Sequence, residues 1–391
     1  MSKMLFVVDE DCYFWWHRLD LARAAREAGF EVAVATRVQA HGRAIEQEGF
    51  RLIPLRLRRG LQSPVRDALA LIELIRLYRR ERPEILHHFS LKPVLFGSLA
   101  ARLCRMPAMV NTITGLGYLF HANGGRRSLL RTAITPVLRW ALGSSCSAVI
   151  FENHDDCGDL VKAGIVQPSH AVVIRGAGVN GVQFAPSPEP TAGEPIVLLP
   201  ARMVWDKGIA EFVDAAKMLK ASGVRARFVL TGGMDPENPT AIPMSLLQQW
   251  QNEGIVEWWG HCEDMPAVLA MAHIVVLPSY HEGLPKSLME AAACGRPIVA
   301  TDIRGCREIV QDGENGFLVP VKNAEALADR IAQLLSDGAL RTRMGLKGRE
   351  LVEREFRIER ITSETIAVYR RLLTQSASVL FREVQLRATR T

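Results

Sequence analysis

Short apolar runs rich in β-branched residues alternate along the chain with longer segments of helical periodicity. In the first half these runs predict strands at 5–8, 31–35, 51–55, 85–88, 109–112 and 148–151. Apolar positions at helical spacing fill 18–28, 64–82, 92–104 and 129–142. Strands and helices that alternate in this way predict a parallel sheet with helices on both faces.

A proline-rich stretch, residues 186–195, interrupts the pattern and is typical of a linker. Strands are then predicted at 196–199, 228–231, 256–259, 274–277, 298–300 and 317–319, with helices at 210–220, 265–271, 286–294 and 324–335. From about residue 339 the pattern is almost entirely helical.

The fold class expected from this pattern is α/β, with two doubly wound, Rossmann-like domains facing across a cleft. We expect a first domain at 1–185, a linker at 186–195 and a second domain at 196–355. Helices at 356–391 are expected to cross back toward the first domain. Ligands of such sheets bind beyond the carboxyl ends of the strands, so those ends are where chemistry is expected.

The composition indicates a protein of a reducing compartment without a membrane span. The seven cysteines include no C-x-x-C pair, which argues against a disulfide framework or a zinc site. The apolar run at 4–8 is too short for a signal peptide, and the longest uncharged stretch, 106–125, contains glycines, a proline and a histidine. We expect a cytoplasmic protein that is soluble or peripheral at a membrane.

Positive charge is concentrated in the first half of the chain. Residues 1–185 contain 24 lysines and arginines against 16 aspartates and glutamates, whereas the whole chain has a net charge of +6. This excess favours contact with an anionic membrane or phosphate, or is a solvated arginine-rich surface. The arginines are not interleaved with aromatics as in nucleic-acid-binding proteins, so we expect no nucleic acid partner.

The segment 278–291 carries the clearest chemistry. It follows the predicted strand 274–277, with Pro285 suited to the first position of a helix and Gly295 to the residue after its end. The amides around Gly283 would then lie at a helix N-terminus, which suits a diphosphate. Glu282 is placed to meet a sugar hydroxyl, and Glu290 to accept hydrogen bonds from ribose.

Two cations follow the first predicted strand of the second domain. Arg202 and Lys207 lie in the loop after 196–199, and both side chains suit phosphate binding. Each feature alone also has a structural interpretation: Glu290 as a solvated helix residue, Arg202 as a surface charge, Gly283 as a turn. The combination makes a binding site the stronger interpretation.

Together these residues resemble the family 4 retaining glycosyltransferases, which have the two-domain GT-B fold. Glu282 and Glu290 match the E-x7-E motif of that family, and Arg202 and Lys207 match its phosphate-binding pair. Further agreement comes from Thr231-Gly232-Gly233, Trp259-Gly260-His261 and the stretch from Asp312 to Pro320. The resemblance covers most of residues 195–375.

The resemblance implies sugar transfer from a nucleotide diphosphate donor with retention of configuration, without a metal and without a cofactor. Arg202 and Lys207 would stabilise the departing diphosphate, and Glu282 would position the sugar. The donor-binding residues it implies are Arg202, Lys207, Gly232, Gly233, Gly283, Leu284 and Glu290. The D-x-D sequence of Asp9 and Asp11 could be a metal motif, but its distance from Glu282 in the sequence favours a chance loop motif.

The acceptor is expected to bind the first domain. Candidate residues follow its predicted strands and are Trp16, His17, His87, His88, Thr114 and Gly115. The aromatics around Trp16 could stack on a sugar, contact lipid or belong to the core. The two adjacent histidines are interpreted equally well as buried structural residues.

The pairing of the segment 87–93 with Thr114-Gly115-Leu116-Gly117-Tyr118 resembles a bacterial subgroup of the family. Its members add hexoses or N-acetylhexosamines to polyprenyl-diphosphate-linked sugars, which implies a UDP-sugar donor, a lipid-linked acceptor and a peripheral position at the inner face of the plasma membrane. Two alternatives remain open at this point: a GT-B sugar-nucleotide epimerase, and a non-catalytic partner subunit that only binds the donor.

Overall fold

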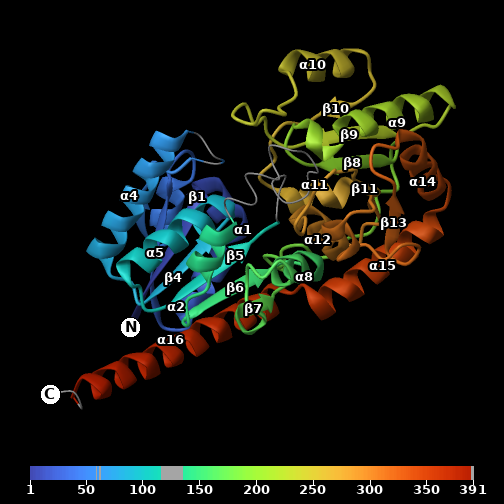
Figure 1. The fold of residues 1–391 in the computed structure, drawn as a ribbon. Helices are drawn as coiled ribbons and strands as arrows, with labels where there is room; N and C mark the ends of the chain where they lie inside the picture. Colours follow the sequence, from blue (N-terminus) through green and yellow to red (C-terminus); the bar gives the residue numbers. More distant parts are fainter. Residues whose placement is uncertain (59, 61–62, 116–134, 389–391) are drawn as a thin grey trace. The chain divides into compact units, whose positions relative to one another are not determined.

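The computed structural model describes residues 1–58, 60, 63–115 and 135–388, with side chains up to residue 378. The predicted helix at 129–142 lies partly outside the described residues, and its described part is helical. The chain forms two compact units. The first contains residues 1–177 and 359–391, and the second contains residues 178–358. Figure 1 shows both α/β units.

The first unit contains a seven-stranded parallel sheet with the order β3-β2-β1-β4-β5-β6-β7. The strands are β1 (Ser2–Glu10), β2 (Phe30–Arg37), β3 (Arg51–Pro54), β4 (Ile85–Phe89), β5 (Met109–Ile113), β6 (Ser147–Phe151) and β7 (Ala171–Val173). The last of these was not predicted, because it is only three residues long and half-buried.

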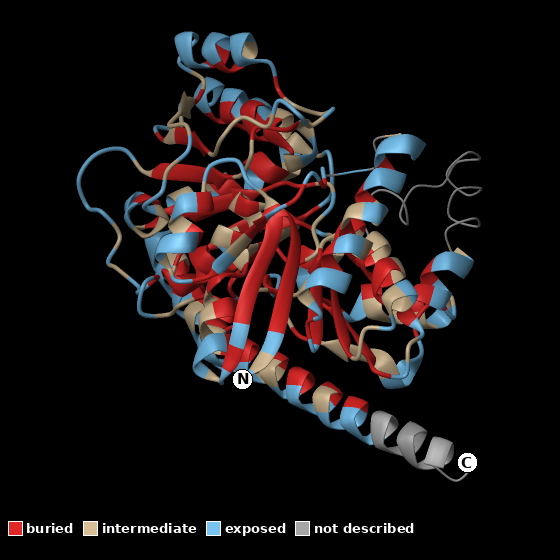
Figure 2. Ribbon diagram, turned by 90° about the vertical axis from the view of Figure 1, so that its left-hand side faces the viewer, coloured by how far each residue is buried: buried red, intermediate tan, exposed pale blue. Residues whose placement is uncertain are grey.

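Successive side chains of β1 point to opposite faces of the sheet, and both faces are covered by helices. Met4, Phe6 and Val8 pack with α1 (Asp11–His17), α2 (Leu19–Glu27) and α16 (Ile358–Ala388). Leu5 and Val7 point the other way, toward α4 (Pro64–Glu81) and α5 (Ser98–Cys104). This unit also contains α3 (Gly42–Gln47), a π-helical turn (Pro93–Gly97), α8 (His154–Lys162) and a 3-10 turn (Pro168–His170). Figure 2 shows the buried strands between helices with exposed outer sides.

The second unit repeats the plan with a six-stranded parallel sheet, ordered β10-β9-β8-β11-β12-β13. The strands are β8 (Ile196–Pro200), β9 (Arg227–Thr231), β10 (Glu257–Trp258), β11 (Ile274–Leu277), β12 (Ile298–Thr301) and β13 (Gly316–Val319). The helices are α9 (Ile209–Ala221), α10 (Met244–Asn252), α11 (Met265–Met271), α12 (Lys286–Ala293), α13 (Arg304–Arg307), α14 (Ala324–Ser336) and α15 (Gly338–Glu355). Along β8, Val197 and Leu199 pack with α9 and α14, whereas Ile196 and Leu198 pack with α11, α12 and α15. The expected α/β class with two doubly wound parallel sheets is confirmed.

The segment expected to be a linker is held against the second unit. Ser187 Oγ accepts a 2.7 Å hydrogen bond from the buried guanidinium of Arg296, and the Pro190 carbonyl lies 3.0 Å from His273 Nε2. Glu189 forms an ion pair of 2.9 Å with Arg341. The boundary between the units therefore lies near residue 177, before the proline-rich stretch.

The two ends of the second unit are joined to each other. The Val179 amide donates to the Phe356 carbonyl at 2.9 Å, and the Ile358 amide donates to the Val179 carbonyl at 3.0 Å. These two bonds place the beginning and the end of the unit side by side.

Candidate active site

The predicted donor residues gather at one edge of the second sheet. Strands β8 and β11 are neighbours, and the connections that follow them lead to opposite sides of the sheet. This is the topological switch point, where open α/β sheets bind their ligands. Arg202 and Lys207 follow β8, and Glu282 follows β11, so the structure brings these residues together at that point.

The loops after β8 and β11 contact each other through their backbones. The Tyr280 amide donates to the Asp206 carbonyl at 2.9 Å. Gly208 has φ +70°, and a Cβ atom there would lie 2.1 Å from the Pro278 carbonyl oxygen, so only glycine fits. As a result, Lys207 Nζ lies 2.5 Å from Glu282 Oε1, with side chains that are 20% and 11% exposed.

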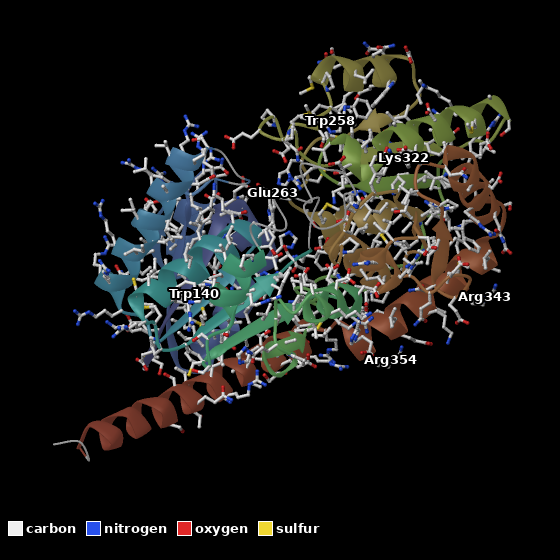
Figure 3. The ribbon with its side chains drawn as sticks, viewed as in Figure 1. Trp140, Trp258, Glu263, Lys322, Arg343 and Arg354 are labelled. Carbon is white, nitrogen blue, oxygen red and sulfur yellow. The ribbon has the colours of Figure 1, made fainter. Side chains whose placement is uncertain are left out.

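Arg202 is held by a second pair of loops. Its guanidinium forms an ion pair with Asp235, which follows the predicted Gly232-Gly233 turn after β9. Gly232 has φ +143°, and a Cβ atom there would lie 1.9 Å from the Ala201 carbonyl oxygen. The Trp258 indole (Figure 3) donates a 3.1 Å hydrogen bond to the Gly232 carbonyl.

The segment after Asp235 is hydrogen-bonded to the loop that contains Arg202 and Lys207. The Trp205 amide donates to the Thr240 carbonyl at 2.8 Å, and the Ile242 amide donates to the Met203 carbonyl at 3.0 Å. The Gly233 carbonyl accepts from the Met203 amide at 3.0 Å. These bonds fix the backbone on both sides of Arg202.

Helix α12 begins at Lys286, as the helical pattern predicted, with Pro285 as its N-cap and not as its first residue. No side chain caps its first turn. An uncapped helix N-terminus offers backbone amides and a positive dipole end to an anion. Its C-terminus ends as predicted at Gly295, which has φ +70° and donates to the Ala292 carbonyl at 3.0 Å.

Glu290 and Leu284 differ in what they offer a ligand. Glu290 is 9% exposed and its Oε1 lies 3.1 Å from Lys286 Nζ, one turn earlier on α12. The Leu284 side chain packs in the core of the second unit, so only its backbone can face a donor.

Gly283 is approached closely by α13, because a Cβ on Gly305 would lie 2.5 Å from the Gly283 carbonyl oxygen.

The loop carrying Glu282 is supported by polar contacts of Tyr280. The Tyr280 hydroxyl donates to Glu211 Oε1 at 2.7 Å, and Lys322 Nζ lies 4.9 Å from the Tyr280 ring centroid. Burial, together with Glu211, raises the pKa of Tyr280, so the hydroxyl stays protonated. Burial also raises the pKa of Cys306, so this thiol beside the Glu282 loop remains neutral.

Sequence reasoning missed Asp235 and Gly305. The only sequence signal for Asp235 is an acid two residues after the glycine pair, and its partner Arg202 lies 33 positions away. Gly305 lies in a short helix that had not been predicted.

In the first unit, Asp11 is a structural anchor. Its Oδ2 atom accepts hydrogen bonds from the backbone amides of Gln39, Ala40 and His41 at 2.8, 3.0 and 2.8 Å, and the side chain is fully buried. Asp9 Oδ1 accepts a 3.3 Å hydrogen bond from Ser90. The D-x-D sequence does not form the expected loop, because Asp9 lies in β1 and Asp11 begins α1.

The adjacent histidines of β4 lie in the core and do not reach the surface. His87 contacts Tyr369 Oη at 2.6 Å and Thr112 Oγ1 at 2.7 Å, and His88 contacts Tyr78 Oη at 2.9 Å and Asn111 Oδ1 at 2.7 Å. All four ring nitrogens are therefore occupied within the fold. Burial lowers the pKa of His87 well below its usual range and that of His88 to about 4, so both rings are neutral. Of the two interpretations left open, the structural one fits this geometry.

The other acceptor candidates remain accessible. Trp16 is 39% exposed and packs edge-on against His41, and His17 is half-buried and stacks on Tyr13 at 4.7 Å between centroids. Thr114 and Gly115 follow β5 and are half-buried. Strands β1, β4 and β5 are neighbours in the parallel sheet, so these residues follow strands that end at one edge.

The solved structures with this fold are glycosyltransferases of the GT-B type. A sucrose-phosphate synthase from Thermosynechococcus elongatus superposes with a TM-score of 0.76 over 96% of this chain and all of that chain, at 22% identity. Anabaena HepE, in a complex with UDP and glucose, gives a TM-score of 0.76 over 94% and 99% of the two chains, at 19% identity. The fold class is therefore GT-B.

The sequence matches two families that together span most of the chain. Residues 3–153 match the family described as Glycosyl transferase 4-like, and residues 183–351 match Glycosyl transferases group 1. The chain belongs to the family 4-like, group 1 glycosyltransferases and is a glycosyltransferase.

Among its relatives are enzymes named for lipid-linked acceptors. An N,N'-diacetylbacillosaminyl-diphospho-undecaprenol α-1,3-N-acetylgalactosaminyltransferase of Campylobacter jejuni is 29% identical over 83% of this chain and 87% of that protein. A UDP-Gal:α-D-GlcNAc-diphosphoundecaprenol α-1,3-galactosyltransferase of Escherichia coli is 25% identical over 71% and 73%.

Proposed function

We propose that this glycosyltransferase transfers a hexose or N-acetylhexosamine from a UDP-sugar to a polyprenyl-diphosphate-linked sugar, with retention of configuration and without a metal ion. The observation that carries the proposal is the meeting of Lys207 and Glu282 at the switch point of the second sheet, with Arg202 on the same loop as Lys207. A cation and a carboxylate at this edge suit a ligand that has both a diphosphate and sugar hydroxyls.

Each polar group has a role that its position supports. Arg202, Lys207 and the N-terminal amides of α12 bind the diphosphate, and Gly232 and Gly233 let the β9 loop approach the donor. Glu290 accepts hydrogen bonds from the ribose hydroxyls. Glu282 binds a hydroxyl of the donor sugar and positions it.

The reaction breaks the bond between the anomeric carbon and the diphosphate oxygen and forms a bond between that carbon and the acceptor oxygen. The acceptor attacks from the face that the diphosphate leaves, and its proton passes to a leaving-group oxygen. Negative charge grows on the diphosphate as the bond breaks, so cations fixed beside it stabilise the transition state. The products are UDP and the extended lipid-linked glycan.

The lipid-linked acceptor is proposed from the named activities of the two relatives and from the basic first half of the chain. Trp16, His17, Thr114 and Gly115 are the proposed acceptor contacts. No described helix combines the length and apolar character that a membrane crossing requires. We place the enzyme in the cytoplasm, in peripheral contact with the anionic inner face of the plasma membrane.

The test is a panel of labelled nucleotide sugars incubated with polyprenyl-diphosphate-sugar acceptors in the presence of EDTA. The expected product is an extended acceptor whose new linkage has, by NMR, the same anomeric configuration as the donor. An inverted linkage would contradict the retaining mechanism. Isomerised donor without transfer would indicate the epimerase alternative, and donor binding alone would indicate a non-catalytic subunit.

A further inference from the structure

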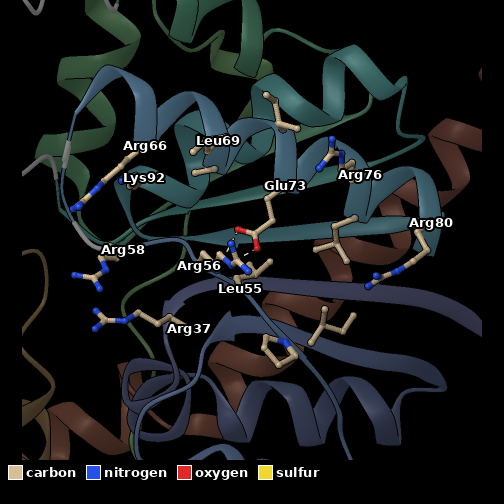
Figure 4. Close-up of a pocket in the computed structure, with 15 residues that line it drawn as sticks. Arg37, Leu55, Arg56, Arg58, Arg66, Leu69, Glu73, Arg76, Arg80 and Lys92 are labelled. Carbon is tan, nitrogen blue, oxygen red and sulfur yellow. Dashed lines mark hydrogen bonds between the residues drawn. The ribbon is translucent and has the colours of Figure 1, made fainter.

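A groove of about 870 Å³ lies in the first unit between α4 and the segment that follows β3 (Figure 4). It belongs to the first unit, whereas the proposed donor residues all belong to the second unit. Its described lining contains seven positively charged side chains and a single carboxylate, that of Glu73. We call it the arginine groove.

Most of this positive charge is not neutralised within the protein. Arg56, Arg58, Arg66 and Arg76 are exposed and form no ion pair with any described carboxylate. The Glu73 carboxylate accepts hydrogen bonds from the Arg56 backbone amide at 3.1 and 3.2 Å.

Two further cations of the groove do have partners. Lys92 is buried, paired with Asp67 at 2.8 Å and bonded to the Gly60 carbonyl at 2.7 Å. Arg80 Nε lies 2.9 Å from Glu81. Several guanidinium groups gathered around one concave surface repel each other, and an anion bound between them would offset that repulsion. Figure 4 shows Arg37, Arg58 and Arg66 pointing toward the same end of the groove.

The groove also has an exposed apolar rim. Leu69 and Ile72 line it although they are 60% and 42% exposed, and Val65, one turn earlier on α4, is 71% exposed. Positions 65, 69 and 72 are spaced by four and three residues, so they share one face of the helix. A surface helix with an apolar stripe beside arginines is typical of helices that lie in a membrane interface.

We propose that the arginine groove and the apolar stripe of α4 dock on a membrane surface and bind the phosphate head groups of anionic phospholipids. Leu69, Ile72 and Val65 enter the acyl boundary, and Arg58, Arg66 and Arg76 contact phosphates. Among the described residues that line the groove there is no aromatic side chain on which a nucleic-acid base could stack. The proposal rests on the peripheral membrane contact proposed above and assigns it to particular residues.

The experiment compares two charge-matched double variants in vesicle co-sedimentation. The test variant is Arg66→Gln with Arg76→Gln. The control is Arg225→Gln with Arg343→Gln, two exposed arginines of the second unit, of which Arg343 is visible on α15 in Figure 3. Vesicles are phosphatidylcholine alone, phosphatidylcholine with phosphatidylglycerol, and phosphatidylcholine with undecaprenyl diphosphate.

We expect the wild type to bind phosphatidylglycerol vesicles and the test variant to bind them about tenfold to thirtyfold more weakly, from the loss of two surface cations. The control should bind like the wild type. Leu69→Gln should weaken binding at both low and high salt, whereas the arginine contribution should fade as salt rises. Donor affinity and circular dichroism of each variant check that the fold is retained.

Three results would overturn the assignment. If the test variant and the wild type bind the vesicles equally, the arginine groove is not the membrane-binding surface, although the protein still contacts the membrane elsewhere. If the wild type does not bind vesicles, the proposed membrane contact is wrong, and its assignment to the arginine groove is wrong as well. Binding that requires undecaprenyl diphosphate and ignores phosphatidylglycerol reassigns the groove to the acceptor. Transfer to a short-chain, water-soluble acceptor, measured in parallel, tests the catalytic proposal separately.

Discussion

Asp235 forms an ion pair with the guanidinium of Arg202, and Glu282 forms one with Lys207, so each proposed diphosphate-binding cation is paired with a carboxylate. A donor diphosphate must therefore share or replace these carboxylates when it binds. We therefore expect Asp235 to act on the reaction through Arg202, as a positioning residue.

Asp235→Ala should lower kcat by about tenfold to hundredfold, because Arg202 loses the contact that orients it toward the leaving group. Asp235→Asn retains an oxygen that can accept from Arg202 and should restore most of the rate. Steady-state kinetics with varied donor concentration give this result directly. If the Ala and Asn variants are equally impaired, the fall in kcat comes from losing the negative charge of Asp235, and the positioning role is wrong.

Arg202→Ala and Lys207→Ala should each reduce kcat by about 10²–10³-fold, the usual cost of removing one preorganised donor from developing charge. The double variant should lose less than the product of the two, because both side chains serve a single leaving group. Single-turnover rates on folded protein provide the measurement. Rates near the wild type in both single variants would refute the donor-site assignment.

Glu290→Ala should raise the donor KM more than it lowers kcat, by an amount equivalent to about 1–3 kcal/mol for hydrogen bonds to a charged group. Glu263→Ala, at an exposed surface glutamate (Figure 3), is the matched control and should leave both constants unchanged. Titration with UDP separates the effect on affinity from any effect on the rate. An unchanged affinity for UDP would show that Glu290 does not hold the ribose.

Activity should persist in EDTA, because Arg202 and Lys207 are proposed to supply the positive charge that a divalent ion supplies elsewhere. The measurement is the initial transfer rate after dialysis against EDTA, with and without added Mn²⁺. Activity that disappears with the chelator and returns with Mn²⁺ would contradict the metal-free mechanism.

His88 should make the stability of the first unit dependent on pH. Its pKa is lowered to about 4 from an ordinary value of 6.5, so the unfolded chain takes up this proton before the folded chain does. The resulting stability is fully present above about pH 6.5 and is lost as the pH falls toward 4, with a total on the order of 3 kcal/mol. Thermal melting of the wild type and His88→Gln at pH 7.5 and pH 5 checks this.

The variant should be less stable at pH 7.5 but should lose less on acidification than the wild type. A parallel pH dependence of the two proteins would mean that His88 is not the group responsible. Selective labelling of histidine for NMR would then identify the group that titrates.

The paired sheets could be predicted from the sequence because each strand is an apolar run and each helix follows at a regular interval. The positions of Arg202, Lys207 and Glu282 after the ends of β8 and β11 could be predicted, because they follow from where the strands end; the roles proposed for these residues come from the family resemblance. The pairing of Arg202 with Asp235 could not be predicted from the sequence, since it depends on the path of the loop after Gly233. For His87 the sequence left burial as one of two interpretations and could not decide between them, because its partner Tyr369 lies 282 residues away on α16.

The two hydrogen bonds of Val179 with Phe356 and Ile358 also link the two places where the chain passes from one unit to the other. The chain passes between the units twice, after residue 177 and after residue 358, and these bonds hold both passages at one place. The proline-rich stretch adds no flexible length between the units, since Glu189 and Pro190 contact residues of the second unit. The units are therefore joined by two separate stretches of chain, so a single backbone cleavage after residue 177 would leave the second unit covalently attached through residue 358.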